Sequence, residues 1–228
     1  MENLQKQLII TGATGMVGEG VLHEAIQSPF VGQILVINRK PCGISHPKVK
    51  EYLLPDFLKP EQMRETIKGY DACLFCLGVS SVGMNADEYK QKTYDLTLGF
   101  AKILHDENPQ MSFSYISGSG TDSAEQSRLA WARVKGKTEN DLSNLGFGDY
   151  YSFRPAMIKP TPGLKNALAF YKYINWIFPI LRKLAPGMAC TLQELGEAML
   201  EVSIFGSSNK TIEGEDILAL AKQMRARL

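Results

Sequence analysis

The sequence predicts an α/β fold: a doubly wound parallel sheet of the Rossmann type with a small C-terminal helical addition. First, short apolar runs alternate with helical patterns along most of the 228 residues, and continuous apolar runs are typical of strands buried on both faces. Second, the N-terminal run leads into three regularly spaced glycines that open a helix. We expect one domain over residues 1–228, in which residues 160–228 form a small C-terminal region on the substrate side.

The predicted elements follow one another at short intervals. A strand at residues 8–11 precedes a helix at 16–27, which Ser28-Pro29 ends. Further strands are predicted at 33–38, 49–54, 72–77, 111–117 and 149–153. Helices are predicted between them at 61–68, 86–108 and 128–145, and beyond them at 191–202 and 216–227. Thr191 and Glu194 have the spacing of a capping box at the start of the helix at 191–202.

Composition and charge argue against several functional classes. The 25 Lys and Arg residues nearly balance the 24 Asp and Glu residues, which does not favour a nucleic-acid surface. The first strand begins near residue 7 and leaves no room for a secretory signal, so we expect a cytoplasmic protein with reduced thiols. Cys73 and Cys76 lie inside an apolar run and are interpreted as core residues on opposite strand faces. The three histidines are scattered without metal-ligand spacing, so no metal site is expected.

The turn after the first strand is the predicted cofactor site. Within residues 8–18, Gly12 permits a tight strand-to-helix turn, and Gly15 lets the backbone approach a pyrophosphate. Gly18 allows the helix to pack closely against the sheet. Backbone N–H groups at the helix start then face the diphosphate of a dinucleotide. The contacts expected in this turn are Gly12, Thr14, Gly15, Met16, Val17 and Gly18.

The residues after the second strand indicate which dinucleotide is bound. An Asp or Glu about twenty residues beyond the third glycine would hold the two ribose hydroxyls of NAD, but this position carries Asn38-Arg39-Lys40. A guanidinium can hold a 2′-phosphate through two hydrogen bonds, whereas a carboxylate would repel it. We therefore favour NADP over NAD, with Arg39 and Lys40 as contacts. The alternative is that both are solvated charges in a loop.

The spacing of the three glycines resembles that of the short-chain dehydrogenase/reductase superfamily, in its extended and atypical branches, over residues 7–160. The NmrA-like, Tat-interacting-protein-like and small epimerase-like members are the groups it resembles most. The resemblance implies that Asp56 and Phe57, after the third strand, lie against the adenine, and that Gly78, after the fourth, lies beside the ribose. It also implies that Pro155 and Ile158, after the sixth strand, contact the nicotinamide end.

The same resemblance implies a catalytic site, and the sequence departs from it at one position. The superfamily uses a Tyr, a Lys four residues later that lowers the pKa of this Tyr, and a Ser at the fifth strand. Lys135 matches the Lys, which also holds the ribose, and Ser119 matches the Ser, with Ser117 as the alternative. The Tyr position holds Trp131, whose indole N–H donates a hydrogen bond but cannot exchange a proton near neutral pH. Other sources of a hydroxyl are Tyr89, Tyr94, Tyr115, Tyr171 and Tyr173.

Residues 167–184 are rich in aromatic side chains but do not predict a membrane span. Lys172, Asn175 and Pro179 interrupt the apolar stretch, and Arg182-Lys183 closes it. We favour a helix that packs on the core or covers a substrate cleft without anchoring the protein in lipid. Peripheral membrane contact through residues 167–184 and a homodimer contact are the alternatives.

Two functions are consistent with these residues. The first is an NADP-dependent oxidoreductase or isomerase of a small molecule that the sequence does not identify, in which Lys135 holds the ribose and Ser119 orients the substrate. The second is a non-catalytic NADP(H)-binding redox sensor or regulatory binding module. The missing Tyr favours the sensor, whereas Lys135 and a Ser119 that looks buried in sequence favour the enzyme. We favour the enzyme.

Overall fold

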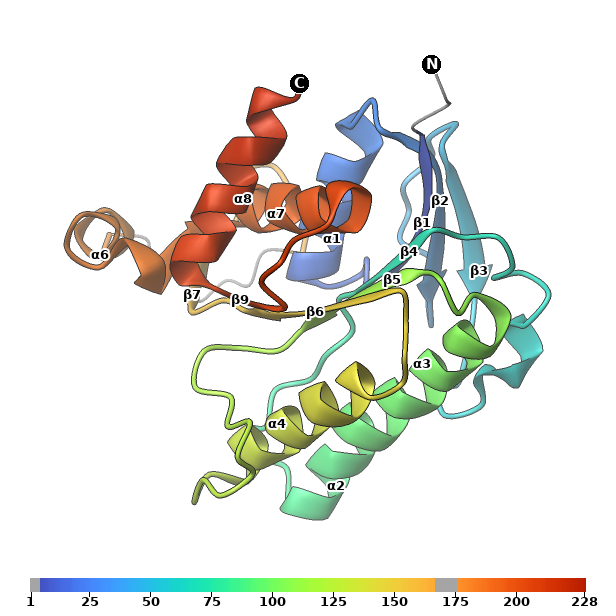
Figure 1. Ribbon diagram of the computed structural model, residues 1–228, viewed down its shortest axis with the longest axis horizontal. Helices are drawn as coiled ribbons and strands as arrows, with labels where there is room; N and C mark the ends of the chain where they lie inside the picture. The colour runs from blue at the N-terminus through green and yellow to red at the C-terminus, as the bar shows by residue number, and fades with distance from the viewer. Residues whose placement is uncertain (1–4, 167–175) are drawn as a thin grey trace.

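The computed structural model describes residues 5–166 and 176–228. Its centre is a seven-stranded parallel sheet (Figure 1). The strand order β3-β2-β1-β4-β5-β6-β9 reverses between β1 and β4, as in a doubly wound sheet. The strands are β1 (Lys6–Thr11), β2 (Val31–Asn38), β3 (Val49–Leu53), β4 (Ala72–Phe75), β5 (Ser112–Ile116), β6 (Asp149–Arg154) and β9 (Thr211–Glu213). The predicted fold class is confirmed, and each of the six predicted strands lies within two residues of its expected bounds.

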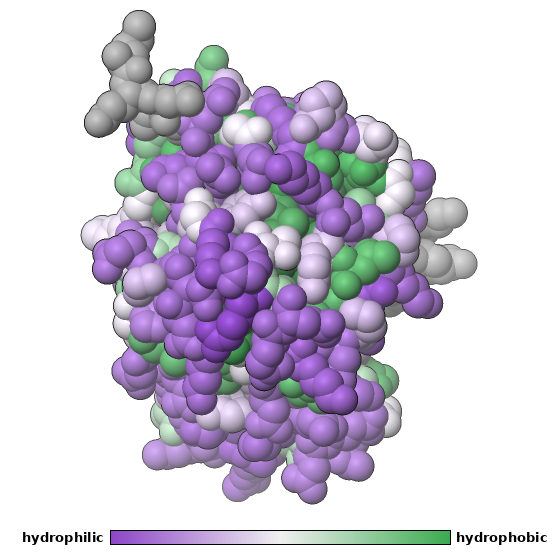
Figure 2. Space-filling model, turned by 90° about the vertical axis from the view of Figure 1, so that its right-hand side faces the viewer, coloured by the Kyte–Doolittle hydropathy of each residue, from purple (hydrophilic) through white to green (hydrophobic). Residues whose placement is uncertain are grey.

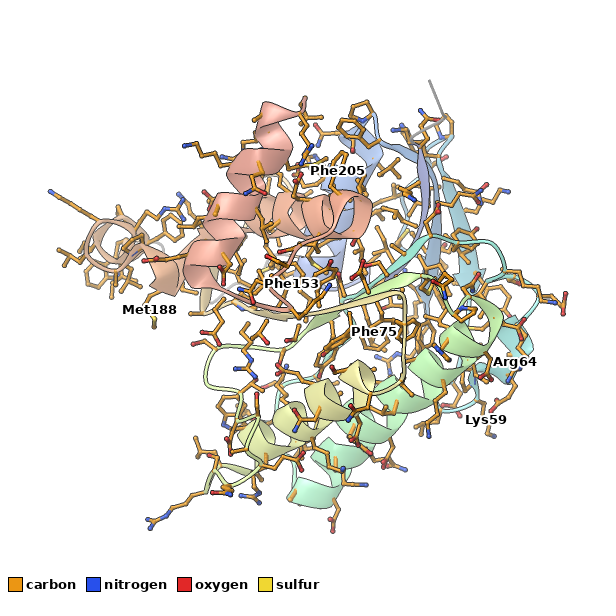
Figure 3. The ribbon with its side chains drawn as sticks, viewed as in Figure 1. Lys59, Arg64, Phe75, Phe153, Met188 and Phe205 are labelled. Atoms are coloured by element: carbon orange, nitrogen blue, oxygen red, sulfur yellow. The ribbon has the colours of Figure 1, made fainter. Side chains whose placement is uncertain are left out.

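Helices cover both faces of the sheet (Figure 1). On one face lie α1 (Met16–Gln27), α7 (Leu192–Phe205) and α8 (Gly214–Ala226), and on the other lie α3 (Leu96–Glu107) and α4 (Ala130–Ser143). Each face has its own apolar cluster because side chains alternate along a strand. Figure 3 shows Phe75 of β4 on the side of α3 and Phe205 among the helices of the opposite face.

Two cysteines, one in β4 and one directly after it, illustrate this alternation. Cys73 belongs to the apolar cluster under α3, and Cys76 packs against the cluster under α1 and α7. Their expected placement on opposite faces is confirmed, and burial raises the pKa of both thiols. Among the described residues, no group of three His, Cys, Asp or Glu side chains is arranged to hold a metal ion.

The helix predicted at 86–108 contains an irregular turn. α2 (Ala86–Lys90) continues through a π-helical turn (Gln91–Asp95) into α3. Asn85 caps its start by accepting a hydrogen bond from the Glu88 N–H at 2.9 Å. A π-turn inserts one extra residue into a helix, and such turns are frequent at functional sites.

Several short elements differ from the prediction. The helix expected at 61–68 is wrong, because the chain forms only a 3₁₀ helix (Pro60–Met63) followed by turns that end at Gly69, where φ is +81°. Three strands of three residues each were not predicted: β7 (Met157–Lys159), β8 (Ala189–Thr191) and β9. β7 and β8 pair in parallel as a second, two-stranded sheet.

The C-terminal part adds α6 (Phe178–Leu184), which projects from the body at the end opposite β3 (Figure 1). Residues 167–175 of the aromatic segment lie outside the described residues. Arg182 holds α6 by donating to the Glu194 carboxylate at 2.5 Å and to the Ala189 carbonyl at 2.8 Å. The capping box of Thr191 and Glu194 at the start of α7 is confirmed. In the part of the chain that the structure describes, no helix is both long and apolar enough to cross a membrane.

Candidate cofactor site

The glycine turn joins β1 to α1 at the carboxyl edge of the sheet. Gly12 has a φ of +73°, and a Cβ there would lie 2.8 Å from the carbonyl oxygen of Cys76. A Cβ on Gly18 would overlap the carbonyl oxygen of Gly12. A Cβ on Gly15 would meet only the Gly12 oxygen, at 3.4 Å. The turn itself therefore requires glycine at 12 and 18, whereas the space beside Gly15 is open.

Two buried side chains hold this turn, and the sequence analysis missed the role of both. The Thr11 hydroxyl accepts hydrogen bonds from the N–H groups of Cys76 and Leu77, each at 3.2 Å. The side-chain oxygen of Asn38 accepts one from the Ala13 N–H at 3.0 Å. These bonds tie the turn to the ends of β4 and β2. The turn is therefore shaped by the protein before a ligand arrives.

The N-terminus of α1 presents unpaired donors beside the turn. The first hydrogen bond within the helix runs from the Glu19 N–H to the Gly15 oxygen at 2.9 Å. The N–H groups of Met16 and Val17 lie before it and have no partner within the helix. No side chain among the described residues caps this end, and Thr14 and Gly15 are exposed. With the positive end of the helix dipole, these donors form a site for an anion.

A cavity of about 220 Å³ lies at the same edge of the sheet. Its walls come from the ends of β2, β3 and β4 and from the π-turn with the start of α3. They are mostly apolar with a few charged groups, which is typical of small-molecule sites. The lining residues are Arg39, Pro55, Asp56, Phe57, Leu58, Leu77, Gly78, Val79, Gln91, Lys92 and Leu96.

The cavity brings together most of the residues predicted to contact the adenosine end. Those that line it are Arg39, Asp56, Phe57 and Gly78. The Asp56 carboxylate also accepts a hydrogen bond from the Leu58 N–H at 2.9 Å, which fixes the loop after β3. Lys40 is exposed and does not line the cavity. The π-turn residues Gln91 and Lys92 were not predicted, since their approach depends on how the helix crosses the sheet.

Lys135 reaches the carboxyl end of β5 from α4. Its ammonium group donates a hydrogen bond to the Ser117 carbonyl at 2.7 Å and lies 5.7 Å from the centroid of the Tyr115 ring. Burial lowers the pKa of Lys135 to about 8, although the Glu139 carboxylate favours the charged form. One acceptor engages one of three ammonium protons, which leaves donors for a ligand.

The two serine candidates differ in their surroundings. Ser117 is buried, and its hydroxyl pairs with that of Thr121 at 2.8 Å. Ser119 is exposed, and its hydroxyl has no hydrogen-bond partner within residues 5–166 and 176–228. The expectation of a buried Ser119 is therefore wrong, because the chain turns outward after β5 towards Gly120, where φ is +85°. A free hydroxyl is still available for a ligand.

The chain after β6 joins the ends of β5 and β6. Pro155 and Ile158 are both buried, and the Pro155 carbonyl accepts a hydrogen bond from the Ser119 N–H at 3.0 Å. Arg154, immediately before them, pairs with Glu139 of α4 at 2.5 Å and with Glu213 at 3.1 Å. This ion-pair network fixes α4, the helix that carries Lys135.

Trp131 borders the loop that carries Ser119. Its indole ring would lie 3.2 Å from a Cβ on Gly120, and it is partly buried. Lys135 is one helical turn further along α4, so Trp131 and Lys135 lie on one side of the helix. The position predicted for a catalytic Tyr therefore carries an indole, which borders the loop of the candidate serine.

The three candidate tyrosines that the structure describes, Tyr89, Tyr94 and Tyr115, all have a raised pKa. Burial raises the pKa of Tyr115 and of Tyr89. The Tyr94 hydroxyl donates to the Asp141 carboxylate at 2.5 Å, and this hydrogen bond raises its pKa. A catalytic phenol needs the opposite shift. Tyr171 and Tyr173 lie outside the described residues.

A buried carboxylate joins the glycine turn to the chain beyond β7. Glu19, in the first turn of α1, is 6% exposed, and its two oxygens accept hydrogen bonds from the N–H groups of Lys165 at 2.9 Å and Asn166 at 2.7 Å. This contact was not predicted from the sequence because 146 residues separate its partners. The segment predicted to lie on the substrate side is therefore attached to the turn predicted to bind cofactor.

Comparisons with curated proteins give distant relatives, two of which match over most of their length. No family model matches the chain. Leucinostatins biosynthesis cluster protein T of Purpureocillium lilacinum is 26% identical over 91% of this chain and 88% of its own. Protein FMP52, mitochondrial, of Debaryomyces hansenii is 26% identical over 90% of this chain and 89% of its own. The similarity therefore extends well beyond the glycine turn.

Solved structures share the fold at low sequence identity. ADP-L-glycero-D-manno-heptose-6-epimerase of Helicobacter pylori has a TM-score of 0.67 and 13% identity, covering 97% of this chain and 82% of its own. WbmH of Bordetella bronchiseptica, solved in complex with NAD+, has a TM-score of 0.66 and 14% identity, covering 91% and 75%. A short chain dehydrogenase family protein of Francisella tularensis has a TM-score of 0.62 and 14% identity, covering 89% and 93%. The fold implied by the resemblance to short-chain dehydrogenases/reductases is confirmed.

Proposed function

We propose that this protein binds NADP(H) along the carboxyl edge of its sheet and acts as an oxidoreductase or isomerase of a small molecule. The observation that carries the proposal is the common edge itself: the open N-terminus of α1, the cavity with Arg39, and Lys135 all lie there. WbmH, which has the same fold, was solved with NAD+, and this supports a dinucleotide. A cation in place of the acid that NAD requires supports NADP.

The residues at this edge fit a nicotinamide dinucleotide. The open space beside Gly15 would accommodate the pyrophosphate, and the N–H groups of Met16 and Val17 would donate hydrogen bonds to it. The bound cofactor supplies or accepts a hydride. Lys135 would hold the ribose, and the free hydroxyl of Ser119 would orient the substrate. Further contacts would be Asp56, Phe57 and Gly78 at the adenosine end and Pro155 and Ile158 at the nicotinamide end.

Titration calorimetry tests the cofactor assignment. We expect NADPH to bind more tightly than NADH, and Arg39→Ala to lose about 1.5 to 3 kcal/mol for NADPH alone, the range for hydrogen bonds to charged groups. Lys59→Ala is the matched control, because Lys59 is an exposed cation (Figure 3) that does not line the cavity. Equal affinity of the unmodified protein for both cofactors contradicts the choice of NADP. Binding of neither contradicts the site.

A non-catalytic NADP(H) sensor is the second candidate function, and Trp131 favours it. An indole is not an acid of suitable pKa for a substrate carbonyl, and the pKa values of Tyr89, Tyr94 and Tyr115 are raised. NADPH oxidation over a panel of aldehydes and ketones separates the two functions. Turnover that Lys135→Ala abolishes supports the enzyme, whereas tight NADPH binding without turnover supports the sensor.

Three further assignments stay predictions. We propose that residues 160–228 supply the substrate side, because Glu19 holds Lys165 and Asn166 at the cofactor turn. The FMP52 relative is named as mitochondrial, whereas a cytoplasmic location is predicted for this chain, and cell fractionation decides between them. A homodimer is testable by light scattering.

A further inference from the structure

The cavity that contains Arg39 has a second cation on another wall. Arg39 enters from the end of β2, whereas Lys92 enters from the π-turn between α2 and α3. The sequence separates the two residues by more than fifty positions, and the sheet and helix bring them to one cavity of about 220 Å³. Lys40, the cation next to Arg39, does not line the cavity.

We propose that Lys92 determines cofactor specificity, and that it holds the 2′-phosphate of NADP(H) together with Arg39. This inference rests on the proposed function, because it requires the adenosine end of a dinucleotide in this cavity. It assigns the π-turn a role: the turn presents a cation to the ligand. The ligand class is an adenosine ribose that carries a 2′-phosphate.

The charges of the cavity favour such a ligand. Arg39 and Lys92 are its two cations, and Asp56 is its one carboxylate. A 2′-phosphate carries nearly two negative charges, so two cations can neutralise it and one cannot. Asp56 already accepts a hydrogen bond from the Leu58 N–H, and a carboxylate at the wall is suited to accept another from the adenine amino group. An unphosphorylated ribose would offer neither cation an anion from the ligand.

Lys92 is free to change partner at little cost. Its ammonium group pairs with Glu88 at 2.6 Å, one turn earlier on the helix, and the two side chains are 44% and 41% exposed. Exposed pairs of this kind contribute little to stability, whereas hydrogen bonds from a cation to phosphate are shorter and stronger than neutral ones. Exchange of the Glu88 carboxylate for a phosphate therefore favours the bound state.

The π-turn accounts for the direction of Lys92. Tyr89 before it and Phe100 after it are both buried under the sheet, so the helix is anchored on either side. Each residue of an α-helix advances the side-chain direction by about 100°. The extra residue of the π-turn therefore changes which positions of the helix face the cavity, and here they are Gln91 and Lys92.

Binding of cofactor fragments tests this inference without any enzyme assay. Calorimetry with 2′,5′-ADP and 5′-AMP, and with NADPH and NADH, compares the unmodified protein with Lys92→Gln and Arg39→Gln. We expect Lys92→Gln to weaken 2′,5′-ADP and NADPH about tenfold, in keeping with the loss of one charge-assisted hydrogen bond. The affinities for 5′-AMP and NADH should not change.

Lys90→Gln is the matched control, because Lys90 is an exposed lysine of the same helix that does not line this cavity. Thermal melting checks that all three variants are folded. The role of Lys92 is overturned if Lys92→Gln binds 2′,5′-ADP as tightly as the unmodified protein does, or if it loses equal affinity for 2′,5′-ADP and 5′-AMP. In either case the proposed function still stands if the unmodified protein prefers NADPH. An unmodified protein that binds none of the four ligands overturns the proposed function and this inference with it.

Discussion

Replacing Gly15 with valine should abolish cofactor binding and leave the fold intact. Gly15 has φ −108° and ψ 165°, an extended conformation that valine adopts readily. A Cβ there meets no atom nearer than 3.4 Å. The side chain would instead occupy the space in which the backbone approaches the pyrophosphate.

The stability change follows from two small opposing effects. Loss of a glycine restricts the unfolded chain and stabilises the protein by about 0.4 to 1 kcal/mol. Gly15 is also the N-cap of α1, where valine is disfavoured by an amount on the order of 1 kcal/mol. The sum lies within about 1 kcal/mol, or roughly 2 to 4 °C in Tm for a domain of this size.

Gly18→Val is the matched comparison, because it changes the same turn in the opposite way. A Cβ at Gly18 would overlap the Gly12 carbonyl oxygen, so we expect a loss of at least about 1 to 3 kcal/mol from overpacking. Melting by circular dichroism measures stability, and calorimetry with NADPH measures binding. A Gly15→Val protein that is folded and binds NADPH normally refutes the assignment of the turn. A Gly18→Val protein as stable as the unmodified one refutes the packing argument.

Four further predictions follow from the site. Trp131→Tyr should create measurable carbonyl reductase activity beside Lys135, read from NADPH absorbance, and activity unchanged from the unmodified protein would contradict the site. The pKa of Lys135 is lowered from 10.5 to about 8 in the folded protein, so the unfolded chain binds more protons than the folded one between pH 8 and pH 10.5. Burial of the charged ammonium group therefore costs on the order of 3 kcal/mol of stability below pH 8. This cost is lost as the pH rises to 10.5. Lys135→Met should therefore be the more stable protein at pH 7, by a margin that shrinks towards pH 10.5 in denaturant titrations. Glu19→Gln should speed tryptic cleavage after Lys165, because the amide nitrogen of the new side chain would face the N–H group of Lys165 or Asn166 and could not accept its hydrogen bond. An unchanged rate of cleavage would show that the contact is dispensable. Vesicle flotation should leave most of the protein unbound by neutral lipid, and recovery of most of it would show that residues 167–184 anchor it.

Most of the strands that were predicted from the sequence share one property, and the missed strands lack it. Five of the six predicted strands contain at least three consecutive buried residues, as in β4, where all four residues are buried. β3, at the edge of the sheet, is the exception, because none of its residues is fully buried. β9 has only Ile212 buried between Thr211 and Glu213, and it exists because it pairs with β6. The helix expected at 61–68 was wrong for a different reason. Its apolar residues do have helical spacing, but after Pro60 the chain forms tight turns up to Gly69.

The residues of the candidate site likewise divide into those that the sequence predicted and those that it did not. The glycine turn was predictable because its requirements are local: Gly12, Gly15 and Gly18 lie within one strand-to-helix connection. Thr11 and Asn38 hold that turn through partners 65 and 25 residues away, and Lys92 reaches its cavity only through the path of a helix. Contacts of this kind depend on the assembled sheet and leave no pattern in the sequence.

The two edges of the sheet bear on how this protein behaves at high concentration. An exposed strand edge can pair with another molecule and seed aggregation, and short or charged edge strands prevent this. At one edge, β3 has five residues and exposes Lys50 and Glu51, on a side of the molecule that is mostly hydrophilic (Figure 2). At the other edge, β9 has three residues and leads directly into α8. Neither edge offers a long template for a foreign strand, so two copies of this chain are expected to associate through helical surfaces and not by extending the sheet.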